Sequence, residues 1–82
     1  MRLPRDLSGD GLASRLRQYG YEPTRQTGSH LRLTSTVRGR EHHVTLPRHA
    51  SLRVGTLSAI LADVADYLEI DRGELSVELF GR

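Results

Sequence analysis

Several absences in this sequence exclude whole classes of protein. No cysteine is present, which rules out disulfides, thiolate zinc sites and cysteine nucleophiles in the 82-residue chain. The apolar runs are far too short to cross a bilayer, and the first residues lack the apolar segment of a signal peptide. Serine-hydrolase and phosphate-loop motifs are also missing. We therefore expect a cytoplasmic protein with no membrane partner.

Lysine is absent too: all 12 basic residues are arginine. One interpretation is a GC-rich genome that favours arginine codons. The other is functional, since guanidinium groups bind phosphate in a bidentate way. A net charge of +2 does not by itself establish nucleic-acid binding. Aromatic residues make up only 5 %, which leaves few rings for stacking on bases.

The length predicts a single domain, residues 1–82, with one modest core. Ser8 is a good helix cap, and the apolar residues after it lie on one side of a helix that ends at Gly20. We expect this helix over residues 9–19. A strand over residues 21–27 comes next, and Pro23 indicates that it lies at the edge of a sheet.

Residues 30–34 alternate with period two, so Leu31 and Leu33 should face the core while His30 faces outward. Residues 35–40 are polar, include a glycine and are typical of a hairpin connection. A third alternating strand begins at residue 42 and stops at Pro47. Matching the apolar faces of the two strands pairs Leu33 with Val44, which places His30 opposite Pro47.

The last third of the chain carries a helical apolar stripe that begins after Gly55. Asp71 and Glu74 have the spacing of a capping box and favour a short final helix. The alternation of Leu75 and Val77 with their neighbours also permits a strand there. The expected fold class is α+β, an α-β-β-β-α arrangement with a three-stranded antiparallel sheet.

Four ordered blocks of the sequence resemble the HicA family. They are Leu3 to Gly9, Gly28-Ser29-His30, Pro47-Arg48-His49, and Gly55-Thr56-Leu57 with Ile60-Leu61. The resemblance covers about residues 3–68. It implies a fold like that of double-stranded-RNA-binding domains, and a ribonuclease toxin that cleaves messenger RNA and is held inactive by a HicB-like antitoxin. The family's catalytic histidine falls on His30, and His49 matches a position where the family often has histidine.

RNA carries its own nucleophile, the 2′-hydroxyl, so cleavage needs a base, an acid and cationic support. A histidine that titrates near neutrality can be the base or the acid, which suits His30 and would leave a cyclic phosphate. Arg25, Arg32 and Arg48 lie on segments that should border His30 and are candidates for binding phosphate. The alternative for each arginine is a solvated surface charge.

Three further residues complete the candidate RNA-binding set: Gly28, Ser29 and His49. Gly28 and Ser29 are interpreted as a tight turn with backbone donors, although an ordinary loop would look the same. The adjacent pair His42-His43 invites a metal hypothesis, but neighbouring strand residues point to opposite faces. No metal and no cofactor are therefore expected.

Two other functions remain open from the sequence. An α-β-β-β-α domain can bind duplex RNA by shape without cleaving it, although such a module normally carries a basic cluster at one helix start. A protein-interaction domain with no RNA role is the third possibility. Growth arrest on expression, relieved by the product of an adjacent gene, would distinguish the toxin from both.

Overall fold

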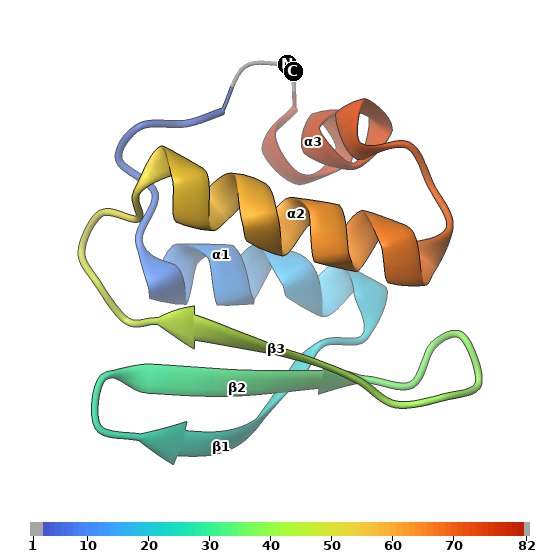
Figure 1. The fold of residues 1–82 in the computed structure, drawn as a ribbon, viewed down its shortest axis with the longest axis horizontal. Coiled ribbons are helices and arrows are strands. Elements are labelled where there is room, and N and C mark those ends of the chain that lie inside the picture. Colours follow the sequence, from blue (N-terminus) through green and yellow to red (C-terminus); the bar gives the residue numbers. More distant parts are fainter. Residues whose placement is uncertain (1–2, 82) are drawn as a thin grey trace.

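Figure 1 shows the computed structural model, which describes residues 3–81. The elements follow one another in a simple order along the chain. They are α1 (Gly9–Leu16), a 3-10 turn η1 (Arg17–Tyr19), β1 (Glu22–Thr27), β2 (His30–Ser35), β3 (His42–Pro47), α2 (Val54–Leu68) and α3 (Arg72–Phe80). This confirms the α+β class and the α-β-β-β-α order expected from the sequence.

The first helix begins and ends at the expected residues, but its last turn differs from the prediction. The Ser8 side chain accepts a hydrogen bond from the Gly11 amide at 2.9 Å, as a helix cap should. Regular α-helix stops at Leu16, and residues 17–19 form the 3-10 turn. Gly20 then adopts a φ of 82°, a left-handed conformation that costs glycine little.

The three strands form an antiparallel sheet in the order β1-β2-β3. Leu33 pairs with Val44 and His30 with Pro47, which confirms the register predicted from the apolar alternation. β1 lies at the edge of the sheet, as Pro23 indicated, and all of its residues are exposed.

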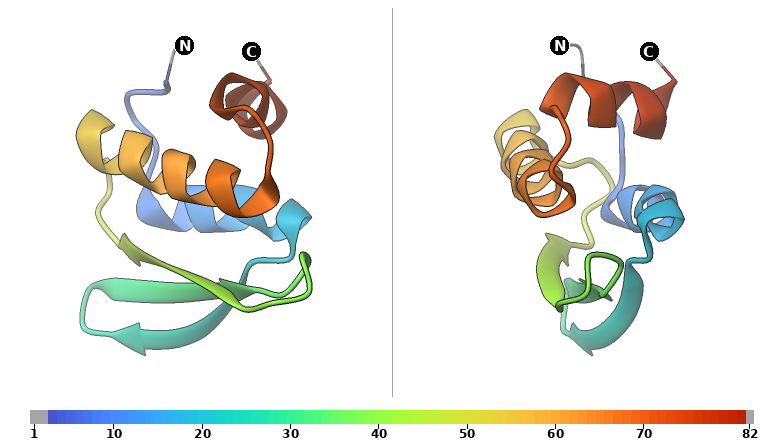
Figure 2. Two further views of the ribbon diagram at one scale, coloured as in Figure 1. Left: turned by 45° about the vertical axis from the view of Figure 1, so that its right-hand side comes forward. Right: turned by 90° about the vertical axis from the view of Figure 1, so that its right-hand side faces the viewer.

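Both α1 and α2 lie on one face of the sheet, and α3 lies on the far side of these two helices (Figures 1 and 2). The opposite face of the sheet has no helix over it in the described part of the chain. We call this uncovered side the open face. None of the helices within residues 3–81 is long and apolar enough to cross a membrane.

The C-terminal segment is a helix, so the strand alternative is wrong. The Asp71 carboxylate accepts a hydrogen bond from the Glu74 amide at 3.2 Å, which is one half of the expected capping box. Leu75 and Leu79 are buried on one side of α3, whereas Val77 is exposed. In a strand, Leu75, Val77 and Leu79 would all lie on the same face, whereas in this helix only the two leucines are buried.

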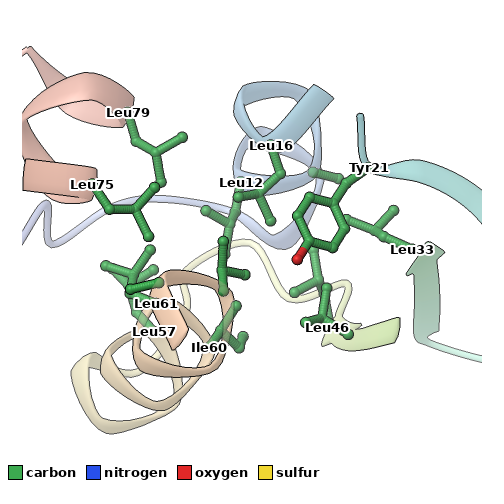
Figure 3. Close-up of a cluster of buried hydrophobic side chains, with 14 of the residues drawn as sticks. Leu12, Leu16, Tyr21, Leu33, Leu46, Leu57, Ile60, Leu61, Leu75 and Leu79 are labelled. Atoms are coloured by element: carbon green, nitrogen blue, oxygen red, sulfur yellow. The ribbon is translucent and has the colours of Figure 1, made fainter. Parts of the chain in front are cut away.

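One cluster of buried apolar side chains joins all the layers. Figure 3 shows Leu12 and Leu16 of α1 between leucines of α2 on one side and those of the sheet on the other. Leu75 and Leu79 of α3 point toward α2. The core therefore lies between the sheet and the helices and leaves the open face free for polar residues.

A polar network also connects the sheet to α2. The Tyr21 hydroxyl lies 2.6 Å from His42 Nδ1, and His42 Nε2 lies 3.1 Å from Asp63 of α2. The His42 ring stacks on Tyr67 with ring centroids 4.6 Å apart. Burial raises the pKa of the Tyr21 hydroxyl above its ordinary value, with smaller contributions from Tyr67 and Asp63, so Tyr21 stays neutral in this network. His42 therefore points into the protein, away from the open face.

The start of α1 packs directly against the end of β3. The Gly9 amide donates a hydrogen bond to the His49 carbonyl at 3.0 Å. A Cβ atom on Gly9 would lie 2.1 Å from the carbonyl oxygen of Pro47, which real contacts do not allow. Only glycine therefore fits between α1 and the strand end that faces His30.

We predict opposite effects for two glycine-to-alanine substitutions. Gly9→Ala should destabilise the protein, because its methyl group meets backbone atoms that belong to another element. Gly55→Ala should stabilise it by up to about 1 kcal/mol, because Gly55 lies in α2 with open space around it and alanine is the better helix former. Urea unfolding of the two variants and the wild type measures both effects. Equal midpoints for the two variants would contradict the close approach.

Candidate functional site

His30 is the first residue of β2 and is exposed on the open face. It pairs with Thr27 across the first hairpin and with Pro47 on β3. Gly28 and Ser29 form the two-residue turn before it, and Gly28 has a φ of 56°. A glycine in this first position is typical of the tight turns that match the twist of a hairpin. Gly28 and Ser29 thus set where the His30 strand begins.

Arg25 and Arg32 face each other across β1 and β2, in the part of the sheet next to His30. Within residues 3–81, neither guanidinium has an ion-pair partner. Like charges directly opposite each other destabilise a sheet. An anion bound beside His30 would therefore stabilise this pair of arginines.

A β-bulge between Pro23 and Arg25 puts Arg25 on this face. Tyr21 and Arg25 are four positions apart, so regular alternation would place them on the same side. The bulge adds one residue, Thr24, and lets Tyr21 enter the core while Arg25 and Thr27 stay on the side of His30. A bulge next to a site commonly redirects side chains in this way.

The open face is hollowed along the sheet. One hollow of about 530 Å³ is lined by Arg25, Thr27, His30, Arg32, His43 and Thr45. A second hollow of about 390 Å³ is lined by Thr24, Arg25, Arg32, Thr34, Glu41 and His43. Because they share Arg25, Arg32 and His43, we treat the two as one depression and call it the polar trough.

Three of the predicted site residues thus come together in the polar trough, namely His30, Arg25 and Arg32. Gly28, Ser29, Arg48 and His49 do not line either hollow. The Arg48 amide does donate to the Ser29 carbonyl at 2.6 Å, so its segment adjoins the turn as expected. Its guanidinium, however, binds Asp10 of α1, with Nε at 2.8 Å and Nη2 at 3.0 Å from the two carboxylate oxygens. His49 is exposed in the loop after β3.

The sequence reasoning missed the other residues of the polar trough. His43 and Thr45 alternate with Val44 and Leu46, so the period of β3 already placed them on the outer side. That alternation could have predicted that His43 and Thr45 lie on the open face. Thr24 depends on the bulge, which the sequence does not reveal. Within residues 3–81, no group of three or more histidine, cysteine, aspartate or glutamate side chains is arranged to hold a metal ion.

The element order and the open, polar sheet face define a small α+β protein with the arrangement of double-stranded-RNA-binding domains. A family model described as "HicA toxin of bacterial toxin-antitoxin" matches residues 9–65, which is more than half of the chain. Neither the curated proteins nor the solved structures contain a significant match. The chain belongs to the HicA toxin family, and it is therefore the toxin of a toxin–antitoxin system. The match includes Gly28-Ser29-His30 and ends before α3.

The Asp10–Arg48 ion pair makes stability depend on pH. The hydrogen bond from Arg48 and its positive charge hold the pKa of Asp10 below its ordinary value. A carboxylate with a lowered folded-state pKa contributes stability above its unfolded pKa, near about 3.9, and loses it as the pH falls through the folded value. The contribution is therefore constant near neutrality and disappears only in acid.

We predict that Asp10→Asn lowers the thermal midpoint at pH 7, because it removes both the ion pair and a negative charge in the first turn of α1. The difference from wild type should persist down to about pH 5 and shrink below about pH 4. Calorimetry of both proteins over this range measures it. A difference that stays the same at every pH would mean that the charge of Asp10 is not involved.

Proposed function

We propose that this protein is an endoribonuclease toxin that cleaves messenger RNA through His30, without a metal ion. The observation that carries the proposal is the position of His30. Its side chain is exposed on the open face, inside the family match, and beside two opposed arginines that lack ion-pair partners within residues 3–81. Cleavage of RNA needs an accessible proton-transfer group and cationic support, and the polar trough offers both.

The proposed reaction is an internal transfer of the phosphate group. The 2′-oxygen attacks the neighbouring phosphorus, the bond to the 5′-oxygen breaks, and a 2′,3′-cyclic phosphate and a 5′-hydroxyl form. His30 either takes the proton from the 2′-hydroxyl or gives one to the departing 5′-oxygen. Arg25 and Arg32 stabilise the charge that develops on the phosphate oxygens.

Four other residues surround the site in this proposal. Gly28 and Ser29 offer backbone groups of the turn to the RNA, and Arg48 and His49 contact it at the rim. Because Asp10 already holds the Arg48 guanidinium, Arg48 contributes less positive charge than Arg25 or Arg32. We further propose a HicB-like antitoxin that covers His30 with an acidic surface, and a cytoplasmic location, where messenger RNA is found.

We predict that His30→Ala reduces RNA cleavage by about 100-fold or more, which is the usual contribution of a proton-transfer group. Because His30 is exposed, the variant should keep the wild-type fold and thermal midpoint. His49→Ala is the comparison: it should raise KM without a comparable loss of kcat. Folded His30→Ala that cleaves as fast as wild type would show that His30 is not the catalytic residue. A wild type that binds duplex RNA without cleaving it would instead leave the alternative of a non-catalytic duplex-RNA-binding module.

Cleavage should also persist in EDTA, because the 2′-hydroxyl supplies the nucleophile and His30 handles the proton. Mass spectrometry of the products should find cyclic-phosphate ends. A strict requirement for added magnesium, or products with a 5′-phosphate, would refute the proposed chemistry.

A further inference from the structure

The polar trough extends well beyond the phosphate that His30 could reach. His43 pairs with Thr34, which is four residues along β2 from His30. At about 3.3 Å per residue, the two ends are roughly 13 Å apart. His43 is therefore too distant to act on the same phosphate as His30, yet both histidines line one hollow.

The His43 ring is held in place by a chain of hydroxyl groups that crosses the sheet. Thr24 of β1 lies 2.8 Å from the Thr34 hydroxyl of β2, which in turn lies 2.7 Å from His43 Nδ1. One ring nitrogen is thus occupied, and Nε2 lies 3.5 Å from the Glu41 carboxylate. An imidazole fixed through Nδ1 presents Nε2 as a directed hydrogen-bond donor when that nitrogen carries the proton.

The polar side chains along the polar trough have a simple order. His30 stands at one end, Arg25 and Arg32 oppose each other in the middle, and His43 is next. Glu41 is the acidic residue of the second hollow and closes the positive stretch. The stretch is long enough for more than one phosphate of an extended strand. A phosphate at His43 Nε2 would replace the Glu41 carboxylate, which lies 3.5 Å from that nitrogen.

We propose that the polar trough is the binding track for a single RNA strand, in which His43 holds a phosphate farther along the strand than the one that is cleaved. The inference rests on the proposed function for the cleavage at His30, but the binding itself does not require it. His43 is a positioning residue here, not a catalytic one. It acts by fixing the register of the strand over His30.

An RNA strand fits the polar trough better than a protein surface does. The lining consists of two arginines, two histidines, threonine hydroxyls and one carboxylate, without a large apolar side chain. The buried centre of a protein interface is normally depleted in charge and rich in aromatic or apolar residues. Single-stranded nucleic acids, in contrast, bind in positively charged grooves that run along the backbone.

The test compares substrates of two lengths. A dinucleotide spans only the scissile phosphate at His30, whereas a hexanucleotide reaches His43. His43→Ala should lower kcat/KM for the hexanucleotide by about tenfold, the loss of one charge-assisted hydrogen bond in an exposed site, and leave the dinucleotide unchanged. His43→Arg places a hydrogen-bond donor at the same position and should restore most of the hexanucleotide rate. An equal loss on both substrates, or no loss on either, would overturn the proposal.

Binding measured without cleavage separates this inference from the proposed function. In a His30→Ala background, the affinity for a labelled hexanucleotide is measured by fluorescence anisotropy over a salt series. Adding Arg32→Ala should weaken binding and flatten the log–log salt slope by about 0.7, the value for one phosphate contact. Arg72→Ala removes the same charge from α3, on the far side of the helices, and should leave the slope unchanged.

If the wild type does not cleave RNA but these binding effects appear, the proposed function fails and the track stands. If Arg32→Ala and Arg72→Ala act alike, the track is wrong, because binding would then depend on net charge alone. Variants of the polar trough that bind RNA normally would also overturn the proposal, whether or not they still bind the antitoxin.

Discussion

Both the core and the open face depend on one constraint, the antiparallel register between β2 and β3. Pairing Leu33 with Val44 sends one set of side chains into the core beneath α1 and α2. The same pairing sends His30, Arg32 and His43 to the open face. A slip of one residue would reverse both sets at once. Because exposing the apolar side chains would cost much free energy, the same register is maintained for the polar side chains of the open face.

Much of the fold could be predicted because burial leaves a period in the sequence. The alternation along β2 and β3 specified both their faces and their register, and the apolar stripe of α2 specified its inner side. The 3-10 turn at Arg17–Tyr19 was not visible, because its spacing differs from that of an α-helix by less than one residue per turn. The C-terminal helix was settled by its cap at Asp71 and by packing on α2, not by its apolar pattern.

The site was predicted less completely than the fold. The position of His30 depends on strand alternation and a family motif, and both are local. The partner of Arg48 could not be found in this way, because Asp10 is 38 positions away and meets it only where α1 reaches the end of β3. Arg25 was placed correctly beside His30, although the bulge that brings it there has no clear mark in the sequence.

That bulge also determines where this chain tolerates a change in length. Removing Thr24 would restore regular alternation, with Tyr21 still in the core and Arg25 still opposite Arg32. A one-residue deletion within β2 would instead exchange the inner and outer residues of the central strand. When relatives of this protein are aligned, a gap at Thr24 should therefore be interpreted as compatible with the same sheet faces, although it removes the hydroxyl that contacts Thr34. A gap between His30 and Thr34 should be interpreted as an error of alignment.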